Sequence, residues 1–201
     1  PFILENEEIH ITASGGISVY PQDATTPEEL LKNVSLALGR AKEEGRDWFQ
    51  LYTMDMNREM QARYALENEL RRGLLENTFF MYYQPKLKAA SGEICGVEAL
   101  MRWIRPGKGV IAPDIFIPLA EEMGEIVSLG EMALLASSEQ IQRWNRNLEK
   151  KLSLAVNVSS KQFNDENFSS SILRGMEKAG INPALLELEI TESVFMSDLQ
   201  R

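Results

Sequence analysis

Two charged side chains, Glu98 and Arg102, stand in a stretch of eight residues, 96–103, that otherwise contains apolar or small side chains. In an extended strand, alternate side chains point to opposite faces, so one face would be apolar and the other would carry the carboxylate and the guanidinium. Burial of both charges is costly unless each has a partner. The stretch therefore predicts either an internal ion pair or a binding site, and these residues alone do not separate the two.

Two later segments show the same alternation. In residues 152–159 large aliphatic side chains alternate with small or polar ones that include Asn157, and in residues 185–192 they alternate with the acids Glu187 and Glu189. Large aliphatic side chains outside and small or polar ones inside are typical of a barrel strand that is covered by helices and has a ligand at its mouth. Strands of an alternating β/α pattern are buried, so a solvated edge is a poor explanation of the two acids.

Four motifs follow one another along residues 79–201. They are Tyr83-Gln84-Pro85, Glu98-Ala99-Leu100 continued by Met101-Arg102-Trp103, Asn157-Val158-Ser159, and Glu189-Ile190-Thr191-Glu192. In order and approximate spacing they resemble the EAL family, bacterial phosphodiesterases that linearise the second messenger cyclic di-GMP. The run from Pro113 to Glu121 also resembles a family helix that frames the guanine end of the site.

The resemblance implies a role for each matching residue. Three oxygen donors from separate strands would ligate Mg²⁺ or Mn²⁺, which prefer such ligands: Glu98, which is also the catalytic residue, Asn157 and Glu189. Four residues would bind the dinucleotide, with Arg102 on a phosphate: Gln84, Leu100, Arg102 and Pro113. Glu192 would steady a neighbouring loop. For Gln84, a buried amide bonded to nearby backbone is the alternative interpretation.

Two functions remain open for the protein. The first is a metal-dependent cyclic di-GMP phosphodiesterase, and the second is a catalytically silent cyclic di-GMP sensor that regulates a partner. In the family, an Asp-Asp-Phe-Gly-Thr-Gly loop and later Lys, Glu and Gln residues follow the position of Glu192, whereas this sequence ends at Arg201. We therefore expect the chain to be a fragment that is inactive alone.

The first fifty residues resemble the end of a GGDEF, or diguanylate cyclase, domain. The matching runs are Ser14-Gly15-Gly16-Ile17-Ser18 with Tyr20-Pro21, and Ala41-Lys42-Glu43-Glu44-Gly45-Arg46. The resemblance implies that Lys42 and Arg46 are remnants of nucleotide phosphate contacts. Basic residues in the last turn of a helix also suit its macrodipole without any ligand. The Gly-Gly-Asp-Glu-Phe loop is absent, so we expect no cyclase activity.

Composition limits the partners. The net charge of −9 over 201 residues argues against binding of long nucleic acid, which needs clustered Lys and Arg. There is no run of about 18 apolar residues that would predict a membrane span, and the lone Cys95 fits a reducing compartment, so we expect a soluble, cytoplasmic segment. Expected partners are cyclic di-GMP, a second copy bound through the EAL domain, and upstream GGDEF and sensory domains, through which the whole protein could be membrane-anchored.

The predicted fold class is α/β. Residues 1–54 are expected to be the tail of a GGDEF-like domain, residues 55–77 a connecting helix, and residues 78–201 the first half of an EAL domain. The resemblance implies an incomplete (β/α)₈ barrel of TIM type whose first strand is antiparallel to the others. An isolated half-barrel exposes strand edges and apolar faces, and we expect it to be poorly stable.

Overall fold

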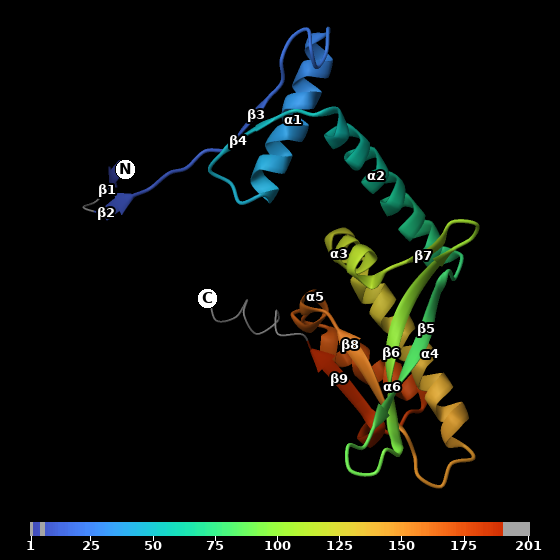
Figure 1. Ribbon diagram of the computed structural model, residues 1–201. Helices are drawn as coiled ribbons and strands as arrows, with labels where there is room; N and C mark the ends of the chain where they lie inside the picture. The colour runs from blue at the N-terminus through green and yellow to red at the C-terminus, as the bar shows by residue number, and fades with distance from the viewer. Residues whose placement is uncertain (1, 5–6, 191–201) are drawn as a thin grey trace. The chain divides into compact units, whose positions relative to one another are not determined.

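The computed structural model describes residues 2–4 and 7–190 (Figure 1). The chain divides into two compact units, Pro1–Leu66 and Glu67–Arg201, and the division falls within helix α2 (Met54–Leu75). This helix corresponds to the one expected over residues 55–77. Within the described ranges, no helix combines the length and the apolar character that crossing a membrane requires.

The first unit is built around helix α1 (Pro27–Glu43). Thr26 caps it, because its Oγ1 accepts a hydrogen bond from the backbone N–H of Glu29 at 3.3 Å, and Pro27 occupies the first turn. The strands of this unit are an antiparallel pair, β1 (Phe2–Leu4) with β2 (Glu7–Ile9), and a parallel pair, β3 (Gly15–Ile17) with β4 (Phe49–Leu51). Residues 10–14, which precede β3, lie in no strand.

The second unit contains one mixed sheet with the strand order β5-β6-β8-β9. Strand β5 runs antiparallel to β6, whereas β6, β8 and β9 are parallel to one another. A short strand, β7, pairs antiparallel with the end of β6 and forms a hairpin with it around Gly107 (φ 70°). The bounds are β5 (Phe79–Leu87), β6 (Ile94–Arg105), β7 (Gly109–Ile111), β8 (Ser153–Val158) and β9 (Leu186–Ile190).

Two long helices of this unit, α4 and α6, cover one face of the sheet (Figure 1). The apolar residues of β6 and β8 on that face, such as Val97 and Val156, pack with Leu134 and Ile141 of α4 in a buried core. The helical elements are α3 (Pro113–Met123), α4 (Ile126–Asn145), α5 (Ser160–Phe163), α6 (Phe168–Ala179) and a 3₁₀ turn, Pro183–Leu185. The side chains that alternate with these apolar ones along each strand lie on the opposite face of the sheet.

The β5–β6 hairpin contains one irregularity. Lys86 lies opposite Gly96 but Leu87 lies opposite Ile94, so Cys95 is an extra residue on β6. Beyond this bulge, residues 88–93 form an exposed turn. Since β6 begins at this end, the turn lies at the opposite end of the strand from Arg102.

The end of α2 is packed onto β6 through Trp103, which is only 1% exposed. The indole Nε1 donates to Thr78 Oγ1 at 3.1 Å, and this hydroxyl donates to the carbonyl of Gly73 in α2 at 3.3 Å. A Cβ at Gly73 would lie 2.6 Å from Thr78 Oγ1, so the helix can approach this closely only with glycine.

Glu69 of α2 is also bound to the β6–β7 hairpin. Its carboxylate pairs with Arg105 Nη1 at 3.0 Å and with the ammonium of Lys108, and its side chain is 19% exposed. The hydrogen bonds from Lys108 and then Arg105 lower the pKa of Glu69. Its contribution to stability is therefore complete above the pKa of an unfolded Glu, about 4.3, and is lost as the pH falls through the lower folded value.

Glu69→Gln is expected to loosen the last turns of α2 by about 1–2 kcal/mol, because it removes the charge from a partly buried pair of hydrogen bonds. Amide hydrogen exchange at residues 67–75 should become about 5- to 30-fold faster at pH 7. The difference from wild type should shrink below about pH 4. Glu76→Gln, at an exposed pair with Arg72, is the control and should leave exchange nearly unchanged. Equal exchange in wild type and Glu69→Gln at pH 7 would contradict the prediction.

Candidate functional site

The polar members of four strands lie on one face of the sheet, opposite the core. Glu98 is in register with Gln84 of β5 and with Ala155 of β8, and Asn157 is in register with Glu189 of β9. Residues in register on adjacent strands point to the same side. The polar side chains that alternate with apolar ones along β5, β6, β8 and β9 therefore form one continuous polar face.

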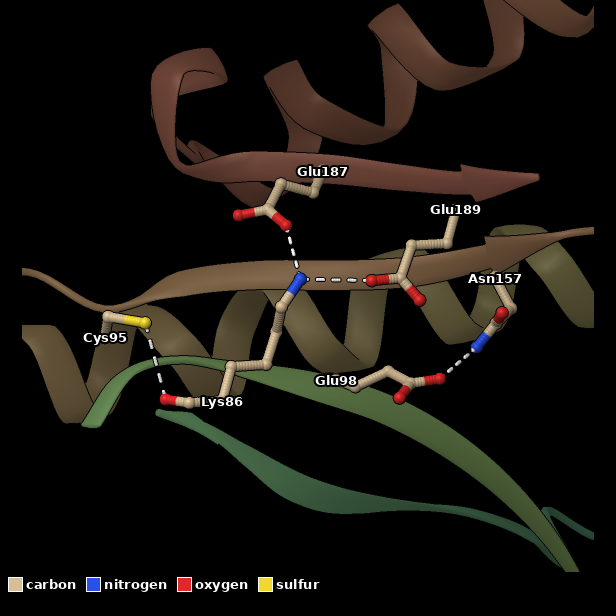
Figure 2. A network of polar contacts seen from close by, with 6 residues as sticks. All are labelled: Lys86, Cys95, Glu98, Asn157, Glu187 and Glu189. Carbon is tan, nitrogen blue, oxygen red and sulfur yellow. Dashed lines mark hydrogen bonds and ion pairs between the residues drawn. The ribbon is translucent and has the colours of Figure 1, made fainter. Parts of the chain in front are cut away.

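Glu98 and Asn157 are in direct contact on this face (Figure 2). The Asn157 amide Nδ2 donates to Glu98 Oε1 at 2.7 Å. The bond occupies one carboxylate oxygen of Glu98 and the nitrogen of the amide, while the amide oxygen of Asn157 remains an acceptor. The contact fixes the orientation of the Glu98 carboxylate.

A second cluster on the same face joins β5 to β9 (Figure 2). The ammonium of Lys86 contacts Glu187 Oε2 at 2.5 Å and Glu189 Oε1 at 3.1 Å. Hydrogen bonding to Glu187 and then to Glu189 raises the pKa of Lys86 above its usual value, and hydrogen bonds from Lys86 and then Ser153 lower the pKa of Glu187. Lys86 is therefore a permanent cation on this face at neutral pH.

A cavity of about 460 Å³ opens beside Glu98 and Asn157. Five of the predicted site residues line it: Glu98, Leu100, Arg102, Pro113 and Asn157. Apolar residues of α3 and α4, including Phe116 and Leu129, also line it, together with polar residues such as Glu121 and Gln162. The cavity thus combines charged and amide groups with apolar side chains.

Arg102 is held at the cavity by two contacts. Its Nη1 donates to the carbonyl of Met101 at 2.9 Å, and its Cζ lies 5.7 Å from the centroid of the Tyr82 ring. Among the residues that the structure describes, Arg102 and Glu98 form no ion pair with each other, so the internal-pair alternative was wrong. The binding-site alternative remains.

Other predicted residues have different positions. Gln84 is exposed, which rules out the buried-amide alternative, and it lies opposite Glu98 without lining the cavity. Lys42 and Arg46 are exposed residues of the first compact unit. Glu192 lies outside the described residues.

Residues 67–201 match the family model described as the EAL domain. The chain belongs to the EAL family. Over its full length it is 39% identical to an uncharacterized signaling protein of Caulobacter vibrioides, of which it covers 24%. Over 98% of its length it is 36% identical to the bifunctional diguanylate cyclase/cyclic di-GMP phosphodiesterase MucR of Pseudomonas aeruginosa, of which it covers 29%. The chain therefore spans about a quarter of the length of these curated relatives.

A solved structure of the PaMucR phosphodiesterase in a c-di-GMP complex is similar to 68% of this chain, with 37% identity and a TM-score of 0.64. The chain covers 55% of that structure. The second unit accordingly has the α/β fold of EAL domains, which is of the TIM-barrel type.

The donors on the polar face of the EAL domain suit a hard divalent cation. Glu98, Asn157 and Glu189 supply carboxylate and amide oxygens, the ligands that Mg²⁺ and Mn²⁺ prefer. The hydrogen bonds found among the described residues engage one oxygen of Glu98 and one of Glu189. No group of three or more His, Cys, Asp or Glu that could hold a metal occurs within ranges 2–4 and 7–190. The fit thus depends on Asn157 as the third donor.

Sequence reasoning missed one residue of the polar face, Lys86. It follows the Tyr83-Gln84-Pro85 motif, and alternation from Gln84 places it on the same face as Glu98. That signal was available, but the partner of Lys86 was not predictable, because Glu187 and Glu189 lie about a hundred residues further along the chain.

Proposed function

We propose that the full-length protein hydrolyses cyclic di-GMP to its linear dinucleotide with Mg²⁺ or Mn²⁺. The observation that carries the proposal is the contact of Glu98 with Asn157 at the edge of a cavity that Arg102 also lines. MucR, which is 36% identical over nearly the whole chain, is named as a cyclic di-GMP phosphodiesterase. The similar PaMucR structure is a complex with c-di-GMP.

Each side chain has a part in binding or orientation. Arg102 binds a phosphate of the dinucleotide, since only one of its five N–H donors is used by Met101 and the Tyr82 ring supports the guanidinium. Leu100 and Pro113 provide apolar surface for a guanine base. Gln84, opposite Glu98, contacts the dinucleotide from β5.

Glu98, Asn157 and Glu189 are the residues that would hold the metal. A divalent ion bound there supplies an activated water and neutralises charge that develops on the phosphate. Asn157 orients the Glu98 carboxylate by its hydrogen bond of 2.7 Å. Hydrolysis adds water across one P–O bond: the water oxygen bonds to phosphorus and the ribose oxygen leaves with a proton.

The wider organisation is also a proposal. We infer that residues 78–201 are the first half of the barrel, that residues 55–77 connect the domains, and that Glu192 steadies a loop. Residues 1–54 would be the tail of a GGDEF domain in which Lys42 and Arg46 are former phosphate contacts. A homodimer through the EAL domain, upstream sensory domains and a cytoplasmic location complete this organisation.

The function is tested by incubating the full-length protein with cyclic di-GMP and either Mg²⁺ or Mn²⁺ and separating the products by chromatography. The linear dinucleotide is expected, and chelation of the metal should stop its formation. If the protein binds the cyclic dinucleotide but yields no linear product, the enzyme proposal is wrong and the sensor function replaces it.

Arg102→Lys is expected to weaken the affinity for cyclic di-GMP about tenfold, because an ammonium cannot reproduce the fork that a guanidinium presents to a phosphate. Calorimetry without divalent metal measures the affinity without turnover. Arg146→Lys, at the exposed residue that directly follows α4, is the control. Equal affinities of Arg102→Lys and wild type would show that Arg102 does not bind the phosphate.

A further inference from the structure

The Lys86 side chain extends across the polar face of the sheet to acidic residues on a distant strand. It belongs to β5, while its two partners, Glu187 and Glu189, belong to β9, and β6 and β8 lie between these strands. Figure 2 shows the Lys86 side chain extending over this face toward both carboxylates. These two ion pairs link β5 and β9, the first and last strands in the order of the sheet.

Small residues leave the space that Lys86 needs. Gly96 is in register with Lys86, Ser153 is in register with Gly96, and Ala155 is in register with Glu187. A Cβ on Gly96 would lie 2.3 Å from Ser153 Oγ and 2.9 Å from the Ser153 carbonyl oxygen. The face is therefore built from small side chains where the lysine crosses it.

The contact with Glu189 leaves that carboxylate available for a second partner. Lys86 engages Oε1 of Glu189, and Figure 2 shows the other oxygen on the side of Glu98 and Asn157. Glu187 takes the shorter contact and so anchors the ammonium next to Glu189. Lys86 holds Glu189 by one oxygen and directs the other toward the remaining donors.

Stability alone is a weak explanation of this cluster. The side chains of Lys86, Glu187 and Glu189 are 34%, 48% and 39% exposed, and ion pairs at such exposure contribute little to folding. Hydrogen bonds to a carboxylate that ligates a metal, in contrast, set its direction and its affinity for the ion.

We propose that Lys86 is a positioning residue that orients Glu189 for metal binding, with Glu187 as the anchor of the lysine. The inference rests on the proposed function, because it takes Glu189 as a ligand. In this role Lys86 acts through the Glu189 carboxylate, which it contacts at 3.1 Å.

The test is the affinity of the full-length protein for Mn²⁺ alone, measured by calorimetry without the dinucleotide. Lys86→Met keeps the length of the side chain and removes the ammonium, and it is expected to weaken Mn²⁺ binding about 10- to 100-fold, the usual effect of losing a partner of a metal ligand. Lys86→Arg, which keeps a charged donor, should bind Mn²⁺ more tightly than Lys86→Met. Lys88→Met is the control, because Lys88 pairs only loosely with the exposed Glu93 at 3.8 Å.

An unchanged Mn²⁺ affinity in a folded Lys86→Met protein would overturn the proposal, and a tighter affinity would show that Lys86 competes with the metal instead. Circular dichroism checks the fold. If Lys86→Met does not fold, Glu187→Gln takes its place, and an unchanged affinity in that variant overturns the proposal equally. Failure of the wild type to bind Mn²⁺ would contradict the proposed function itself, whereas an effect missing only from the variants contradicts the role of Lys86.

Discussion

Replacement of Glu98 by alanine in the full-length protein is expected to lower the rate of cyclic di-GMP hydrolysis at least about 1,000-fold, with the fold intact. Loss of the metal ligand that we propose at Glu98 would remove several kcal/mol of stabilisation of the charge that develops in the transition state. The carboxylate contributes no core volume, because Glu98 is half-buried on the polar face while Val97 and Ala99 supply the packing. Chromatographic measurement of the linear product gives the rate, and circular dichroism gives the fold.

Glu93→Ala is the matched control for this experiment. Glu93 is an exposed acid of the turn that precedes β6, where it pairs with Lys88 and Lys150 at 3.8 and 3.5 Å. Its replacement should leave hydrolysis within about twofold of wild type, as expected for weak surface pairs. A Glu98→Ala protein that still produced linear dinucleotide at the wild-type rate would remove Glu98 from the catalytic site.

Trp103→Ala is expected to destabilise the EAL domain by about 3–5 kcal/mol, the usual cost of truncating a buried Trp. The ring is 1% exposed, stacks on Phe79 at 5.3 Å between centroids and meets Phe116 edge-on at 6.0 Å. Its loss also leaves Thr78 without the indole donor. Hydrogen exchange of β5 and β6 amides, measured at increasing urea concentrations, gives the change in the free energy of unfolding.

Leu173→Ala tests whether this effect depends on burial. Leu173 of α6 is 59% exposed, so its truncation should change stability by less than about 1 kcal/mol. A comparable loss of stability in the two variants would mean that Trp103 is not the centre of its packing cluster. Activity adds a second measure, because Trp103 directly follows Arg102 in the motif that lines the cavity.

Most elements of the EAL domain were predictable from residue patterns. The alternation along residues 96–103 and 152–159 fixed which side chains face the core, and β6 and β8 bury Val97, Ala99, Leu154 and Val156 on that side. Helices α4 and α6 begin and end where glycine or polar turns interrupt their periodic apolar positions, a signal that the sequence carries.

Contacts between distant strands could not be predicted in the same way. Alternation specifies the face on which a side chain lies but not which strand lies beside it. The grouping of Glu98 with Asn157 was therefore predicted only through the family resemblance, and the contacts of Lys86 with Glu187 and Glu189 were missed. The strand β7 was also missed, because Gly109–Ile111 is too short to show a period and forms only through pairing with Trp103–Arg105. Roles that require a bound metal or dinucleotide stay predictions for Glu98, Asn157 and Glu189.

The bulge at Cys95 gives the β5–β6 hairpin a place where added chain can be absorbed. The extra residue already interrupts the ladder between Lys86 and Leu87, and the turn of residues 88–93 beyond it is exposed. The pairing of Gln84 with Glu98 lies on the other side of this interruption, within the continuous ladder. A peptide tag or a small reporter domain inserted between Ser91 and Gly92 would therefore leave the register of Gln84 with Glu98 in place, which makes this turn a suitable attachment point for following the protein in living cells.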